Sequence, residues 1–148
     1  MNKTQQQIPL RDRDHTSLLV LLEEAQGKFG CVPEEFITEI AQSLNISKSE
    51  VYGVATFYSF LSTRPLGRYV IRVCKSLPCY LKNSQMIIES VGKELGIKPG
   101  ETTPDGKFSL ELTNCIGACD KAPAMLINSD VHGDLTPKKV SQILKSYD

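Results

Sequence analysis

The chain has 148 residues, of which 41% are hydrophobic and 23% charged, and its 17 basic side chains balance its 17 acidic ones. Composition this close to the globular average excludes disordered and fibrous proteins, and zero net charge without a basic tract argues against nucleic-acid binding. The N-terminal segment 1–13 lacks the apolar core of a secretion signal, and the longest apolar run, Leu18 to Leu22, is too short to cross a bilayer. We therefore expect a soluble cytoplasmic protein with no direct membrane insertion.

The first half of the chain predicts three helices. Apolar residues recur at helical spacing over residues 14–29. A second helix over 33–44 is expected to begin with proline, which suits the first helical position, and to end before Asn45, which tolerates left-handed backbone. The capping box Ser47–Glu50 opens a third helix, expected over 48–61.

The third predicted helix carries apolar or aromatic residues around almost its whole circumference. This pattern predicts that it is buried on several sides. A three-helix unit of this size offers only a small core, however. Tyr52, Tyr58 and Phe60 are therefore the candidates for packing on a second domain or on another protein.

Residues 64–67, Arg-Pro-Leu-Gly, separate two predicted domains. We expect a helical docking domain over 1–66 and a second domain over 67–148. The second domain is predicted to contain a strand over 68–73, a helix over 84–95, strands over 107–112 and 124–128, a short strand around Val131, and a helix from Pro137. The order β-α-β-β-α indicates an α+β protein whose second domain is a small sheet covered by helices, a thioredoxin-like layout.

Four cysteines occur as two close pairs, each following a predicted strand. The first pair is Cys74-x4-Cys79, and the second is Cys115-x3-Cys119. Gly117 and its neighbouring alanine let the backbone curl tightly and bring N–H groups close to a bound sulfur. Two close thiol pairs are typical of a metal site.

Three other interpretations of the four thiols compete with an iron–sulfur cluster. Disulfides do not suit the expected reducing compartment, and a dithiol redox centre normally uses Cys-x-x-Cys. Zinc also accepts four thiolates, but its knuckles mostly use a two-residue gap. A 2Fe–2S cluster needs two thiolates for each of two separated irons, so the wider gaps favour the cluster while leaving zinc open.

The fifth cysteine, the two histidines and the lysines near the pairs are not assigned as metal ligands. Cys31 has no partner cysteine nearby in the sequence and is expected to be a small buried hydrophobe. His15 and His132 are not near the cysteines in the sequence and are assigned no ligand role. Three lysines flank the pairs and could offset the charge of a negative cluster. They are Lys75, Lys82 and Lys121.

Six sequence segments together resemble the NuoE-type subunit of NADH dehydrogenases. They are residues 51–60 (VYGVATFYSF), 73–79 (VCKSLPC), 96–110 (GIKPGETTPDGKFSL), 115–119 (CIGAC), 122–124 (APA) and 135–140 (LTPKKV). The resemblance runs from about Leu18 to the last helix. It strongly favours the cluster over zinc.

The resemblance implies a helical domain joined to a thioredoxin-like ferredoxin domain that binds one 2Fe–2S cluster. Cys74, Cys79, Cys115 and Cys119 fall on the family's ligand positions, the first two expected on one iron and the last two on the other. The chain departs mildly from some relatives at residues 76–78, Ser-Leu-Pro. The proline there stiffens the loop and lacks an N–H, which would alter the hydrogen bonding of the cluster.

Proteins of this family work beside a NuoF-like flavoprotein subunit that carries FMN and binds NAD(P)H, and beside further iron–sulfur subunits. They occur in respiratory complex I, in NAD-linked or electron-bifurcating hydrogenases and in NAD-dependent formate dehydrogenases. This chain lacks a Gly-x-Gly-x-x-Gly motif, so FMN and NAD(P) are expected on the partner. The resemblance therefore implies a non-catalytic electron-transfer subunit. The alternatives are a free-standing 2Fe–2S ferredoxin that shuttles electrons or senses redox state, and a zinc-stabilised interaction module.

Overall fold

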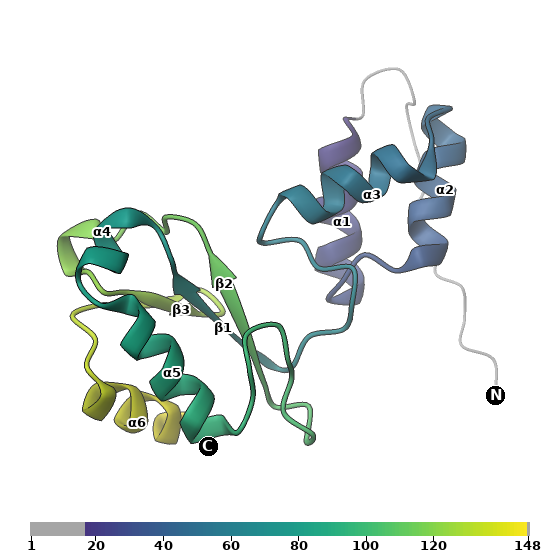
Figure 1. Ribbon diagram of the computed structural model, residues 1–148. Coiled ribbons are helices and arrows are strands. Elements are labelled where there is room, and N and C mark those ends of the chain that lie inside the picture. The colour runs from purple at the N-terminus through teal and green to yellow at the C-terminus, as the bar shows by residue number, and fades with distance from the viewer. Residues whose placement is uncertain (1–16, 148) are drawn as a thin grey trace. The chain divides into compact units, whose positions relative to one another are not determined.

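The structure, a computed structural model, describes residues 17–147 (Figure 1). It divides into two compact units, the first ending at Arg64 and the second beginning at Pro65. Within the described residues, no helix has the length and apolar character needed to cross a membrane. The expectations for the segment 1–13, for a helix start at Asp14 and for His15 concern residues outside this range.

The first unit consists of three helices whose ends follow local sequence signals. They are α1 (Leu18–Phe29), α2 (Glu34–Leu44) and α3 (Lys48–Phe57). The hydroxyl oxygens of Ser17 and Ser47 accept backbone hydrogen bonds at the starts of α1 and α3. Helices α1 and α2 end at Gly30 and Asn45, both with left-handed backbone. Pro33 is the N-cap residue of α2 and not its first helical residue, as was predicted, so the helix begins one residue later, at Glu34.

Helix α3 differs from its prediction in length and in burial. It stops at Phe57 because Tyr58 takes an extended backbone, with φ −87° and ψ 115°. The Leu61 N–H then donates to the Tyr58 carbonyl at 3.0 Å, and Leu61 packs against the core of the unit. The expected burial on several sides is wrong, since α3 buries Val51 and Ala55 alone while Phe57 is 79% exposed.

The second unit is a four-stranded sheet with helices. Its elements are β1 (Tyr69–Cys74), α4 (Leu77–Leu81), α5 (Ser84–Leu95), β2 (Phe108–Thr113), the 3₁₀ turn η1 (Cys119–Lys121), β3 (Met125–Ile127), β4 (Asp130–His132) and α6 (Pro137–Ser146). The sheet order is β2-β1-β3-β4, with β1 parallel to β2 and antiparallel to β3. The predicted strands and helices are present in their expected order, with the short strand around Val131 as β4, so the full order is β-α-α-β-β-β-α. Elements α4 and η1 lie in stretches that were expected to be loops.

One face of this sheet is covered by α5 and α6 (Figure 1). Side chains alternate between the two faces of the sheet along β1, so Ile71 and Val73 point into this core and Cys74 points to the other face. They pack with Val91 of α5 and Val140 of α6. Complete burial of each such side chain contributes about 1.5–3 kcal/mol to the stability of the folded unit. This core therefore holds in place the strands whose ends carry the cysteine loops.

Candidate metal centre

The sheet register brings the two cysteine loops to the same edge. Cys74 is the last residue of β1 and is paired with Thr113, the last residue of β2. Because these strands are parallel, the chain leaves both of them on the same side of the sheet. Cys79 follows in α4, and Cys115 and Cys119 follow in the loop after β2. The structure thus brings the four predicted residues to one end of the unit.

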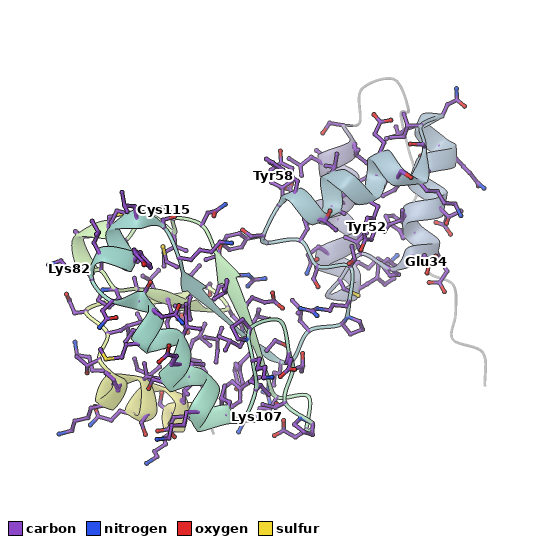
Figure 2. All side chains as sticks on the ribbon, viewed as in Figure 1. Glu34, Tyr52, Tyr58, Lys82, Lys107 and Cys115 are labelled. Atoms are coloured by element: carbon purple, nitrogen blue, oxygen red, sulfur yellow. The ribbon has the colours of Figure 1, made fainter. Side chains whose placement is uncertain are left out.

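Figure 2 shows this arrangement from the side. The labelled side chains Cys115 and Lys82 lie at the same end of the unit. Lys107, just before β2, lies at the opposite end. The candidate site therefore occupies the end of the sheet that is farthest from the start of β2.

Cys74 and Cys79 form the inner pair of thiols. Each is 1% exposed, and both belong to a small buried cluster with Ala124. The Cys74 N–H donates to the Ala124 carbonyl at 3.2 Å, which ties β1 to the start of β3. Burial, followed by the hydrogen bond with the Cys74 thiol, raises the pKa of Cys79 to about 11. This thiol is therefore protonated at neutral pH, and a metal must displace its proton.

Cys115 and Cys119 form the outer pair, and both are exposed. Their Sγ atoms are 3.3 Å apart. Gly117 has a φ of 81°, which L side chains rarely adopt, and its N–H donates to Cys115 Sγ at 3.4 Å. This N–H, and then the hydrogen bond with Cys119, lower the pKa of Cys115. The tight turn predicted from Gly117 is thus present and favours the thiolate.

The inner and outer pairs lie close enough to affect each other. The charge of Cys119 contributes to the raised pKa of Cys79, and the charge of Cys74 contributes to the raised pKa of Cys119, whose largest cause is the hydrogen bond with Cys115. Within residues 17–147, no three or more His, Cys, Asp or Glu side chains gather to hold one metal ion.

This donor set fits a 2Fe–2S cluster. All five cysteines are free thiols, so neither pair is closed as a disulfide. A 2Fe–2S cluster takes two thiolates for each iron, which two adjacent pairs can supply. The Gly117 N–H already points at a sulfur, as N–H groups around such clusters do.

Cys31 and His132 lie outside the elements and loops that carry the four thiols. Cys31 is buried in the helical unit, as expected, and burial raises its pKa. The His132 ring lies against Tyr147, with Nε2 3.2 Å from the Tyr147 hydroxyl. The three flanking lysines predicted to offset cluster charge are all exposed. That effect stays a prediction.

The sequence reasoning missed the short helix that contains Cys79. Helix α4 buries Cys79 and exposes Leu77, Tyr80 and Leu81. Ser76 is its N-cap residue, and Pro78 lies in its first turn. A serine followed by a proline within two residues is a recognised helix start and was the available signal.

Comparison with known proteins adds independent findings. The family described as thioredoxin-like 2Fe–2S ferredoxin matches residues 2–148. The curated E subunits of NADH-quinone oxidoreductase from Pseudomonas aeruginosa and Escherichia coli are 44% and 46% identical to this chain over 126 residues, covering 85% of it and 76% of each relative. An NAD+-reducing NiFe hydrogenase, in its air-oxidised crystal structure, matches 95% of this chain with a TM-score of 0.71 and 23% identity. This chain spans 24% of that hydrogenase chain, and at this identity the match shows the fold alone.

Proposed function

This chain belongs to the thioredoxin-like 2Fe–2S ferredoxin family, and from that premise we propose that it is the electron-transfer subunit of a multi-subunit NAD(P)H-linked oxidoreductase. The predicted family and the α+β, thioredoxin-like fold class are confirmed. The observation that carries the proposal is the meeting of two free thiol pairs at the shared edge of two parallel strands.

Cys74 and Cys79 hold one iron of the proposed cluster, and Cys115 and Cys119 hold the other. When bound, the cluster supplies one-electron redox chemistry. The inner pair excludes water, since both thiols are 1% exposed. The outer pair leaves one side of the site open to a partner.

The chain itself performs no bond-making step in this proposal. It lacks a nucleotide-binding glycine motif, so FMN and NAD(P)H belong to a NuoF-like flavoprotein subunit. Further iron–sulfur subunits carry the electrons onward. The curated relatives bear the name of a component of NADH-quinone oxidoreductase, which supports a place in such a complex.

The helical unit docks the chain onto the flavoprotein in this proposal. Its surface exposes four aromatic side chains on and after α3. They are Tyr52 (50% exposed), Phe57 (79%), Tyr58 (41%) and Phe60 (48%). Figure 2 shows Tyr52 on α3 and Tyr58 just after its end. Exposed aromatic residues in this number are typical of a protein interface. One of them, Tyr52, also lines a groove of about 540 Å³ together with Ile37.

The test of the cluster is an absorption spectrum and an EPR spectrum of the anaerobically purified chain, before and after dithionite. We expect visible bands that bleach on reduction, a spin-half signal, and two irons and two sulfides per chain. A colourless protein that holds one zinc would overturn the electron-transfer function. A colourless, metal-free protein that also fails to take up iron and sulfide would overturn it equally.

The test of the docking role is co-purification with the flavoprotein whose gene neighbours that of this chain. Phe57→Ser should weaken the complex about tenfold or more, because a central aromatic side chain is lost. Val20→Ser is the matched control, since Val20 is 43% exposed on α1 of the same unit. A wild-type chain that forms no stable complex would contradict the docking role while leaving the cluster assignment standing.

A further inference from the structure

Helix α4 presents an apolar face directly over the inner thiol pair. Leu77, Tyr80 and Leu81 are 67%, 63% and 73% exposed. Their spacing of i, i+3 and i+4 places them on one side of the helix, while Cys79 between them is 1% exposed and faces inward. Single exposed apolar side chains are ordinary, but three on one side of a five-residue helix form a patch. We call these three residues the α4 face.

Positive charge flanks α4 along the chain, because Lys75 comes two residues before it and Lys82 directly after it. The two cysteine loops, 75–83 and 114–122, carry four charged side chains, and all four are exposed. Three are lysines, Lys75, Lys82 and Lys121, and the fourth is Asp120. An apolar centre with a charged rim is the usual anatomy of a protein interface, and lysines on the rim favour a partner that carries carboxylates.

The position of the α4 face decides what kind of partner covers it. On the other side of the thiols lies the sheet, whose core is closed by α5 and α6. Cys119, one of the exposed outer thiols, is close enough to Cys79 of α4 for its charge to contribute to the raised pKa of Cys79. Electron transfer falls steeply with distance, so a redox partner gains most by docking where the thiols come closest to solvent. That place is the α4 face together with the outer pair.

We propose that the α4 face and the three lysines of the cysteine loops, Lys75, Lys82 and Lys121, form the electron-exchange surface of this chain. The partner that binds this surface is an acidic redox protein with an apolar patch around its own cofactor. This inference rests on the proposed function, because it requires the cluster. One electron crosses the interface in each encounter, the donor losing it and the cluster gaining it, and no bond forms or breaks. The aromatic surface around α3 then anchors the complex, and the α4 face carries the electrons.

A flavodoxin, an acidic protein that carries FMN, serves as the probe. The full chain with its cluster is mixed with oxidised flavodoxin and treated with a carbodiimide, which joins lysines directly to carboxylates. Mass spectrometry of the digested product should find the links at Lys75, Lys82 and Lys121. Lys107 and Lys138 are the internal controls, since they lie outside the two cysteine loops and should remain unlinked.

The second measurement is the stopped-flow rate at which reduced flavodoxin bleaches the cluster. The double variant Leu77→Gln/Leu81→Gln should react about tenfold more slowly, because it loses two apolar contacts at the centre of the interface. Reduction by the methyl viologen radical, which needs no docking surface, should stay within about twofold of wild type. Val131→Thr is the matched control, since Val131 is 53% exposed on β4, and it should leave both rates unchanged. Lys75→Gln/Lys82→Gln should slow the flavodoxin reaction and flatten its dependence on salt.

The outcomes separate this inference from the function on which it rests. Cross-links away from the cysteine loops, or an unchanged flavodoxin rate in the α4 variant, would overturn the α4 face alone. So would a cluster that the viologen reduces and flavodoxin does not. A wild-type chain without a cluster would overturn the proposed function and this inference with it. If Leu77→Gln/Leu81→Gln loses its cluster, Lys75→Gln/Lys82→Gln and the cross-links decide the matter.

Discussion

The two cysteine loops supply the same thiol chemistry in opposite settings. Cys74 and Cys79 are buried against Ala124, on a strand end and in a short helix. Cys115 and Cys119 are exposed, around a glycine with positive φ. The thiols of the inner loop are buried, whereas those of the outer loop are exposed although Ile116 and Ala118 beside them pack against the inner cluster. A site divided in this way can protect bound metal on one side and remain accessible on the other.

Replacing one predicted ligand in each loop should give the largest difference between the two pairs. Cys79→Ser should abolish cluster binding, because a buried hydroxyl replaces a thiolate where nothing can rearrange around it. Cys119→Ser should keep a cluster that is shorter-lived and spectrally shifted, because the exposed loop can adjust. Iron content and EPR after anaerobic reconstitution measure both variants. An equal loss of iron and of EPR signal in the two variants would show that burial does not make the two thiol pairs differ in cluster binding.

Alkylation of the metal-free protein by iodoacetamide should separate the thiols next. At pH 8 Cys115 should react about a hundredfold faster than Cys79 or more, because its pKa lies below the ordinary 9.0 while that of Cys79 is about 11. As pH rises, labelling of Cys115 should reach half of its maximal rate below pH 9, because its pKa is lowered from 9.0, whereas labelling of Cys79 should keep increasing towards pH 11. Peptide mapping by mass spectrometry follows each site. Similar rates for the two thiols would contradict the contrast in burial.

A pair of glycine substitutions should test how the outer loop is held. Gly117→Ala should destabilise the loop by about 1–2 kcal/mol and speed cluster loss, because φ is 81° although the space around it is open. Gly27→Ala, in α1 and equally open, should stabilise the chain by about 0.5–1 kcal/mol, since alanine favours helix. Urea unfolding of the metal-free chain measures both. Changes of the same sign in the free energy of unfolding of the two variants would contradict the role given to the backbone of Gly117.

The smallest effect on the site is expected at the fifth cysteine. Cys31→Ala removes a buried thiol from the helical unit and should cost about 1 kcal/mol of stability. Iron content and the EPR signal should match wild type, because Cys31 lies in the other compact unit. A lowered iron content would make Cys31 a participant in the site.

Most element boundaries could be predicted because short-range chemistry determines them. Serine caps, Asn45 and Gly96 mark helix ends through local hydrogen bonds and backbone geometry. The end of α3 could not be predicted in this way. Residues 58–61, Tyr-Ser-Phe-Leu, continue an apolar helical pattern, and only the docking of Leu61 against the unit's core bends the chain there.

The candidate site was predictable in its residues but not in its environment. Spacing identified the two thiol pairs, and the glycine between Cys115 and Cys119 indicated the turn. Burial of Cys79 depends on Ala124, which comes from a distant part of the chain, and no local pattern shows that contact. The same limit applies to α4, because five residues are too few for helical periodicity to appear.

The parallel pairing of β1 with β2 also sets the order in which this protein can be made. Cys74 and Thr113 become neighbours only after α5 has crossed between the two strands. Such a distant pairing forms late in folding, because a long loop must close first. Under the proposed function, the complete set of four thiols exists only once these strands have paired. Cluster content would then measure how many chains have finished folding.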